Sequence, residues 1–192
     1  MKKYFIVCLT LFLVQCSTTR ISELYQVYDK VNYIYWSESK QLSWQDFEGQ
    51  PLASSNNYAS ELHIYNPATI EKANLFSSPK LTSICVFDKK HSWVNQKIAN
   101  DDILLYNQII FNIYELYTRM LRKEFKNTDF SLDDYIKEFH LMAEKNNSNL
   151  SDRIEKFRSE SDLGQHKRAL ERWNKIIDDE LASLNDYKMD EK

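Results

Sequence analysis

The sequence predicts an α+β domain, with strands in its N-terminal half and helices in its C-terminal half. Two short runs rich in β-formers, Tyr58 to Tyr65 and Leu81 to Asp88, predict strands. The stretch from Asp101 to Phe125 contains no Gly or Pro and repeats apolar residues at steps of three and four, which predicts a long helix. Helical patterns continue beyond Ser131, so we expect further helices to cover this one.

The predicted long helix has two faces. Its apolar face consists of Tyr106, Ile110, Ile113, Tyr117, Met120 and Leu121, widened by Leu105, Ile109 and Leu116. Its polar stripe consists of Gln108, Asn112, Glu115, Arg119, Arg122 and Lys126. Asn100 is placed to cap the first turn. Glu115 and Arg119 lie one turn apart, and we interpret them as an ordinary ion pair on the polar stripe.

The shorter elements follow from local signals. Tyr33 to Trp36 predicts a first strand, and residues 66–80, which contain two prolines, predict mostly loop. Gly49 predicts a turn with positive φ. The remaining helices are expected from Ser131 to about Lys145, from Ser151 to Ser159 after a break at Asn146 to Asn149, and from Gly164 to Leu184.

The first fifteen residues predict a targeting segment. Lys2 and Lys3 precede an apolar run from Tyr4 to Val14, which is too short to span a bilayer. Leu13 to Cys16 resembles a bacterial lipobox, although Gln15 departs from the usual small residue. This resemblance implies cleavage before Cys16 and lipidation of Cys16 itself; an uncleaved or simply secreted leader is the alternative.

Length and composition limit the remaining possibilities. The chain has 192 residues, 14% of them aromatic, and a net charge of -3. We expect one packed domain at residues 40–186, after a lead-in at 16–39 and before a polar tail at 187–192. The charge gives no basic footprint for nucleic acid. With Cys8 removed and Cys16 acylated, Cys85 has no disulfide partner, and its apolar neighbours predict a buried residue.

Residues Leu104 to Ile113 resemble the metal-site helix of a bacterial secreted family of predicted zinc-dependent proteases. That family reads Leu-Leu-His-Glu-Gln-x-His-Phe-Asp-Ile. Here Tyr106 and Ile110 stand where the two metal histidines would be, and Asn107 stands where the general-base Glu would be. The scaffold positions match, and the chemical positions do not.

Further matches extend the resemblance from Leu42 to about Leu181. Leu42 to Pro51 is similar to the family's Leu-x-Trp-x-Asp-Phe-x-Gly-x-Pro, and Ser92-Trp93-Val94 also recurs. Residues 157–164 fit a junction that reads Tyr-Asp-x-x-Thr-x-His-Gly in the family, with Leu163 in place of the His. The resemblance therefore implies a zincin-like fold, with a small N-terminal sheet packed on the long helix.

The same residues predict no zinc chemistry. Two imidazoles four residues apart bind zinc and the adjacent Glu activates the bound water, whereas Ile110 has no ligand atom and a neutral Tyr106 is a poor ligand. The histidines of the chain, His63, His91, His140 and His166, show no ligand spacing. We therefore expect no catalytic residue, no metal and no cofactor.

These observations predict a lipoprotein of the cell envelope, anchored in the outer membrane of a Gram-negative bacterium as Ser17 after the lipobox implies by resemblance. Its domain would be a catalytically inactive relative of the zinc proteases that binds an envelope protein. An envelope hydrolase with an unrecognised site and a purely structural lipoprotein are the alternatives. Metal content and residual peptidase activity distinguish the inactive relative from the hydrolase.

Overall fold

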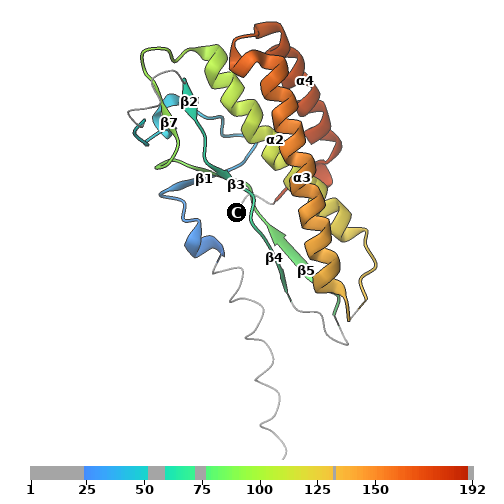
Figure 1. Cartoon of the computed structure of the whole chain (residues 1–192). Helices are drawn as coiled ribbons and strands as arrows, with labels where there is room; N and C mark the ends of the chain where they lie inside the picture. Colours follow the sequence, from blue (N-terminus) through green and yellow to red (C-terminus); the bar gives the residue numbers. More distant parts are fainter. Residues whose placement is uncertain (1–23, 52–58, 72–76, 132, 190–192) are drawn as a thin grey trace, which may run out of the picture.

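The computed structural model of the chain describes residues 24–51, 59–71, 77–131 and 133–189. Strands occupy the N-terminal half and three packed helices occupy the C-terminal half, which confirms the predicted α+β class (Figure 1). The predicted targeting segment 1–15, Cys16 and the last three residues of the predicted tail lie outside the described residues.

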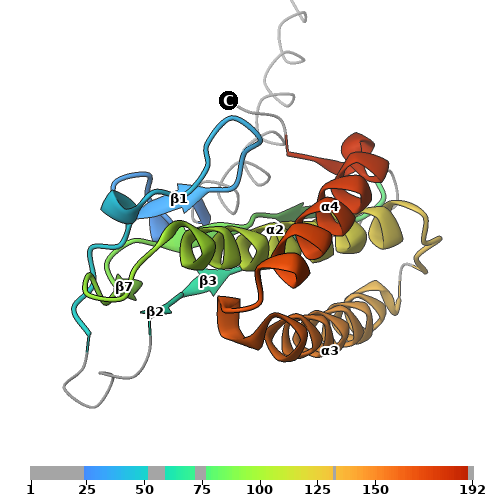
Figure 2. The ribbon, with the colours of Figure 1, turned by 90° about the horizontal axis from the view of Figure 1, so that it is seen from above.

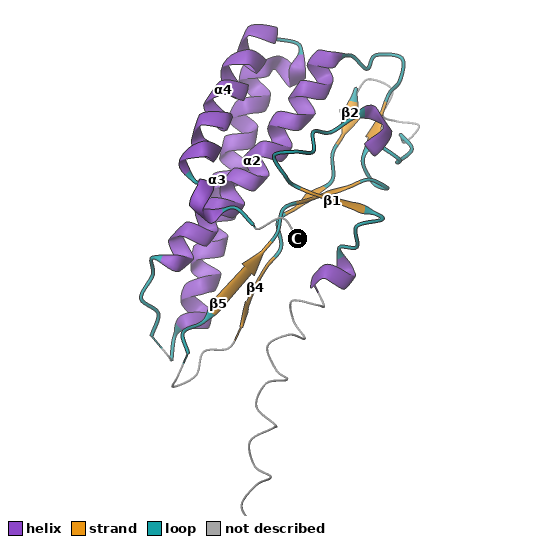
Figure 3. Ribbon diagram, turned by 180° about the vertical axis from the view of Figure 1, so that it is seen from behind, coloured by secondary structure: helices purple, strands orange, loops and turns teal. Residues whose placement is uncertain are grey.

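The strands form three small antiparallel sheets (Figure 3). The first has the order β1–β6–β3, with β1 at Tyr33–Tyr35, β6 at Val86–Asp88 and β3 at Ile64–Tyr65. The second pairs β2 (Ser60–Glu61) with β7 (Trp93–Val94), and the third pairs β4 (Ala68–Glu71) with β5 (Lys80–Ser83). The predicted strand at Tyr33 is thus confirmed.

A helical turn at residues 24–27, three long helices and three 3₁₀ turns complete the regular structure of the described residues. The helices are α2 (Asp101–Lys126), α3 (Tyr135–Ser161) and α4 (Lys167–Ser183), and the 3₁₀ turns are η1 (Trp44–Asp46), η2 (Asp162–Gly164) and η3 (Asn185–Tyr187). The predicted cap of α2 is confirmed, because the Asn100 side chain accepts a 3.0 Å hydrogen bond from the Ile103 amide.

Helix α2 lies between the strands on one side and α3 and α4 on the other (Figure 2). Ile109, Ile113 and Leu116 are fully buried within the largest apolar cluster of the fold. A second cluster joins the C-terminal end of α2 to α3 and to the β4–β5 hairpin through Leu121 and Phe139. Both faces of α2 are therefore covered.

Two of the sequence predictions about the helices are wrong. The predicted break at Asn146 to Asn149 does not occur, because α3 continues without interruption. Met142, Asn146 and Leu150 recur every four residues on its buried side, so packing outweighs the modest helix propensity of Asn. The last helix starts at Lys167 rather than at Gly164.

The strand predictions need three corrections. The region 66–80, predicted as loop, contributes β4 and the start of β5 to a hairpin in which Ile70 lies opposite Leu81. The predicted strand Leu81 to Asp88 is divided at Ile84 and Cys85, and its two parts join different sheets. The predicted strand Tyr58 to Tyr65 likewise divides into β2 and β3, with Tyr58 itself outside the described residues.

The two glycines serve different purposes. Gly49 does not adopt a positive φ, which corrects the prediction; it is required by close approach, because a Cβ there would lie 2.7 Å from the Ser92 carbonyl oxygen. Gly164 has φ +93° and follows two residues in the left-handed region, Asp162 and Leu163. A Cβ on Gly164 would lie 3.0 Å from the Tyr106 Cβ, so the turn before α4 packs directly on α2.

Candidate functional site

The positions that match the family's two metal histidines lie inside the core. Tyr106 and Ile110 are both buried, and the Tyr106 ring stacks on Phe157 of α3 with centroids 5.2 Å apart. Burial raises the pKa of the Tyr106 hydroxyl, and the Arg158 guanidinium opposes this shift. A neutral phenol packed between two helices is a structural group.

The other two positions that match the family's site, Asn107 and Leu163, do not form a site with Tyr106 and Ile110. Asn107 is fully buried; its Oδ1 accepts a 3.0 Å hydrogen bond from Ser60 Oγ, and its Nδ2 has no partner among the described residues. Leu163 is 49% exposed. Within the four described ranges of the chain, no group of three or more His, Cys, Asp or Glu side chains lies close enough to hold a metal ion.

The polar stripe of α2 is buried, which contradicts the prediction of an ordinary solvated ion pair. Lys126, the last residue of the stripe, is exposed. We call the other five residues, Gln108, Asn112, Glu115, Arg119 and Arg122, the polar seam. Glu115 is only 3% exposed and Arg119 is completely buried. The prediction failed because the segment before η1 and the segment after α4 both cover this side of the helix.

The N-terminal part of the polar seam holds the segment that precedes η1. Gln108 accepts a 2.8 Å hydrogen bond from the Leu42 amide and donates one of 2.8 Å to the Asn112 side-chain oxygen. The same oxygen accepts a 2.8 Å hydrogen bond from the Trp36 indole. These bonds satisfy polar groups that burial would otherwise penalise.

The C-terminal part of the polar seam is an ionic cluster. Glu115 Oε1 accepts hydrogen bonds from Arg119 Nε at 3.0 Å and from Arg122 Nη1 at 3.2 Å. Arg119 also donates to the Leu181 carbonyl at 2.9 Å, and its guanidinium lies 4.8 Å from the centre of the Trp36 ring. One carboxylate therefore fixes two guanidinium groups that reach into different parts of the chain.

Arg122 extends the cluster in two further directions. Its Nη2 donates to the Ser83 carbonyl at 2.7 Å, and its Nη1 donates to the Tyr187 carbonyl at 2.9 Å. The polar seam thus joins β5, the end of α4 and η3 to the central helix. Three of its hydrogen bonds go to the backbone carbonyls of Leu181, Tyr187 and Ser83, and the others bind side chains or the Leu42 amide, so the seam connects fixed parts of the fold as a structural network does.

Electrostatics support this structural interpretation. Burial raises the pKa of Glu115, while Arg122 and Arg119 act in the opposite direction. Nearby, burial raises the pKa of the Cys85 thiol well above 9.0. Cys85 is therefore a buried, protonated thiol, as predicted, and is not activated for nucleophilic chemistry.

An apolar groove lies between the first helical turn (residues 24–27), β4 and the start of α3. Its volume is about 750 Å³. The lining comes from Leu24, Val27 and Tyr28, from residues 67–70, and from the α3 residues Tyr135, Ile136, Phe139 and His140. Val27 is 63% exposed and Ile136 is 52% exposed. The sequence analysis missed this groove because its walls come from three distant segments.

No helix in the described part of the chain is long and apolar enough to cross a membrane. Comparisons with protein-family models, with curated proteins and with solved structures find no match for this chain.

Proposed function

We propose that this chain is a lipid-anchored envelope protein whose domain, a zincin-like relative without zinc chemistry, binds a protein partner through the apolar groove. The observation that carries this proposal is the groove itself. The packing of Tyr106 and Ile110 in the core supports the absence of zinc chemistry from this proposal, because neither side chain is available as a metal ligand.

The lining of the groove suits a protein segment. Val27 and Ile136, on opposite walls, expose large aliphatic side chains. Exposed apolar surface of this kind marks interaction sites in soluble domains. A groove bordered by a strand and a helix accommodates an extended or helical segment that inserts apolar side chains.

The position of the groove relative to the expected anchor also favours an envelope partner. Leu24, in the groove wall, follows Cys16 by eight residues. Eight residues span at most about 29 Å. A lipid on Cys16 would therefore keep the groove close to the membrane surface, within reach of other envelope proteins.

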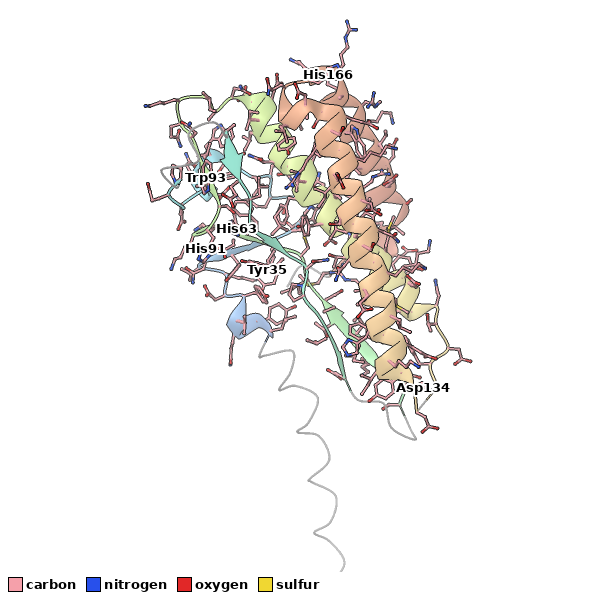
Figure 4. All side chains as sticks on the ribbon, viewed as in Figure 1. Tyr35, His63, His91, Trp93, Asp134 and His166 are labelled. Carbon is pink, nitrogen blue, oxygen red and sulfur yellow. The ribbon has the colours of Figure 1, made fainter. Side chains whose placement is uncertain are left out.

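Charge distinguishes a protein partner from the lipid surface. Asp133 and Asp134, at the start of α3, are exposed beside the groove residue Tyr135; Figure 4 labels Asp134 at that end of the helix. Anionic headgroups attract basic segments and are repelled by acidic ones. The acidic rim instead complements a partner segment whose apolar residues are flanked by Lys or Arg.

Site-specific photo-crosslinking in intact envelopes tests the docking proposal. A photoreactive residue replaces Val27 or Ile136, one in each wall of the groove, or Ile176 as the control. Ile176 is a partly exposed apolar residue of α4, which contributes nothing to the groove. We expect one protein of the same mass to be captured from both groove positions and not from position 176.

The rim makes the test specific for the proposed contact. Replacing both Asp133 and Asp134 with Lys should reduce capture from position 136 by at least tenfold, because it reverses the charge that selects the partner. Capture of lipid alone, or equal capture of the same protein from position 176, would contradict the proposal.

Lipidation is tested separately. Cys16→Ser should abolish labelling by a fatty-acid probe and release the protein from membranes, since the acylated residue would be lost. Fractionation and probe labelling of the wild type and the variant provide the measurement. Labelling that persists in the variant would exclude Cys16 as the modified residue.

A further inference from the structure

Two histidines that are distant in sequence meet at the edge of the three-stranded sheet. His63 lies between β2 and β3, and His91 lies in the turn after β6 (Figure 4). Their ring centroids are 5.9 Å apart, and both rings are accessible to solvent. With metal–nitrogen bonds of about 2.0–2.1 Å, two imidazoles on one ion place their centroids roughly 5–6.5 Å apart. The observed separation falls within this range.

The two segments that carry the histidines are fixed to each other through their backbones. The His63 amide donates a 2.9 Å hydrogen bond to Ser92 Oγ, and the His63 carbonyl accepts one of 2.8 Å from the Asp88 amide. Ser92 and Asp88 are both buried. The spacing between the two backbone segments that carry the rings is therefore set by the scaffold, as a preorganised ligand pair requires.

Each imidazole also has a carboxylate against one of its ring nitrogens. His91 Nδ1 lies 2.7 Å from Asp88 Oδ2, and Asp88 Oδ1 accepts from the amides of Lys90 and His91 at 3.0 and 3.1 Å. His63 Nε2 lies 3.4 Å from Glu61 Oε1. Glu61 is held in turn by a 2.8 Å hydrogen bond from the Trp93 indole.

This pattern is similar to the outer-shell arrangement of metal-binding histidines. A histidine that ligates a metal almost always donates its other ring N–H to a carboxylate, a carbonyl or water, which fixes the ring and its tautomer. Here the carboxylates leave Nε2 of His91 and Nδ1 of His63 for a ligand.

The turn that carries His91 is also supported from the opposite side. The Gly49 amide donates to the Ser92 carbonyl at 2.9 Å, the Glu48 amide donates to the Lys89 carbonyl at 2.8 Å, and Glu48 forms an ion pair with Lys89. The absence of a Cβ at Gly49 permits this close approach.

We propose that His63 and His91 form a two-histidine site for a divalent transition-metal ion of the class that prefers imidazole, completed by water. The site is separate from the positions that match the family's zinc ligands, since it uses the sheet edge and not α2. Among such ions Cu²⁺ binds nitrogen ligands most tightly, so it is the probe of choice.

The experiment titrates Cu²⁺ into the full chain in detergent micelles, with affinity measured by calorimetry and nitrogen ligation by electron paramagnetic resonance. We expect one ion with nitrogen ligands in the wild type. His63→Gln and His91→Gln should each lower the affinity at least tenfold. His140→Gln and His166→Gln are the matched controls, because both of these exposed histidines lie outside the pair, and they should bind as the wild type does.

Asp88→Asn tests the positioning role of the carboxylate. It keeps an acceptor for the two turn amides and removes the charge beside His91, so it should lower Cu²⁺ affinity about 10–100-fold while the nitrogen signal is retained at saturation. Circular dichroism melts verify that each variant is folded. Wild-type affinity in either the His63 or the His91 variant, or no nitrogen signal in the wild type, would overturn the proposal.

Discussion

The two halves of α2 carry the same pattern of paired positions one turn apart, and the fold uses them in opposite ways. In the N-terminal half, Tyr106 and Ile110 face α3 and the turn before α4 and fill the interior with apolar contacts. In the C-terminal half, Glu115 and Arg119 are equally buried, yet they are charged and joined by a 3.0 Å hydrogen bond.

The difference concerns what each half has to join. Tyr106 and Ile110 pack within the apolar core, where complementary shape is sufficient to hold the contact. The ionic cluster of Glu115, Arg119 and Arg122 meets the backbone carbonyls of Ser83, Leu181 and Tyr187, which offer hydrogen-bond acceptors. Guanidinium groups suit such a junction, because they present several donors in fixed directions.

The largest expected effect in this comparison comes from Glu115→Ala. The change leaves Arg122 without its carboxylate and leaves Arg119 with only the exposed Glu38, 3.6 Å away, so the free energy of unfolding should fall by about 3–5 kcal/mol. This reverses the small effect that an exposed stripe implies. Urea denaturation measures the loss of unfolding free energy, and Glu124→Ala is the control. Glu124 is an exposed acidic residue of the same helix and pairs with Lys145 at 3.4 Å. Its replacement should cost under about 1 kcal/mol.

Equal, small costs for Glu115→Ala and Glu124→Ala would show that water reaches the polar seam. The interpretation of Glu115, Arg119 and Arg122 as a buried ionic cluster would then have to be abandoned.

The apolar half is tested by Ile110→Ala. The side chain is almost completely buried, so its truncation should cost about 2–5 kcal/mol through lost transfer energy and a residual cavity. Ile98→Ala is the control, because Ile98 is 45% exposed and lies before the helix. Thermal and urea unfolding of both variants provide the measurement, and similar losses in the two would contradict the assignment of Ile110 to the core.

The sequence was sufficient to predict helix α2 and its first residue, and insufficient to predict which segments cover it. Periodicity and Asn100 predict the existence and the cap of α2, because both signals are local. The burial of Glu115 and Arg119 depends on Trp36 and on the segment after Leu181, which approach from opposite ends of the chain. A polar stripe looks the same in sequence whether water or a distant segment covers it.

The same limit applies to the two candidate binding features. His63 and His91 meet only because β3 pairs with β6, and the groove forms only because β4 folds beside α3. Neither pairing leaves a signal at short sequence range.

Gly164→Ala sharpens the comparison at the apolar end, with a smaller expected effect. A Cβ would meet Ile103 Cδ1 and Tyr106 Cβ at 3.0 Å, and the positive φ disfavours an L side chain, so stability should fall by about 1–3 kcal/mol. Leu163→Gly, at the neighbouring left-handed position, should stay within about 1 kcal/mol of the wild type, since relief of strain offsets the added entropy of the unfolded chain. Equal losses in the two variants would argue against close packing of this turn on Tyr106.

The smallest expected effect concerns Cys85, whose Sγ lies 4.0 Å from the Phe111 carbonyl oxygen of α2 and close to Glu115. Burial raises the pKa of this thiol well above 9.0, and the negative charge of Glu115 adds to the shift. Well below pH 9 the thiol is protonated in both the folded and the unfolded chain, so its full contribution to stability is present. As the pH rises past 9, the unfolded chain releases the proton first, and stability should fall by about 1.4 kcal/mol per pH unit until the folded pKa is reached.

Cys85→Ala removes this titration and keeps every tyrosine, although it also removes the contribution of Cys85 to the raised pKa of Tyr114. Urea unfolding at pH 8 and pH 10 should therefore show a loss for the wild type that exceeds the loss for the variant by about 1.4 kcal/mol. The sign follows from the raised pKa: a thiol whose pKa was lowered by the guanidinium groups would make the wild type gain stability relative to the variant over the same interval. Identical pH slopes would mean that Cys85 ionises as easily in the folded chain as in the unfolded one, and that the charged half of α2 is open to solvent at this point.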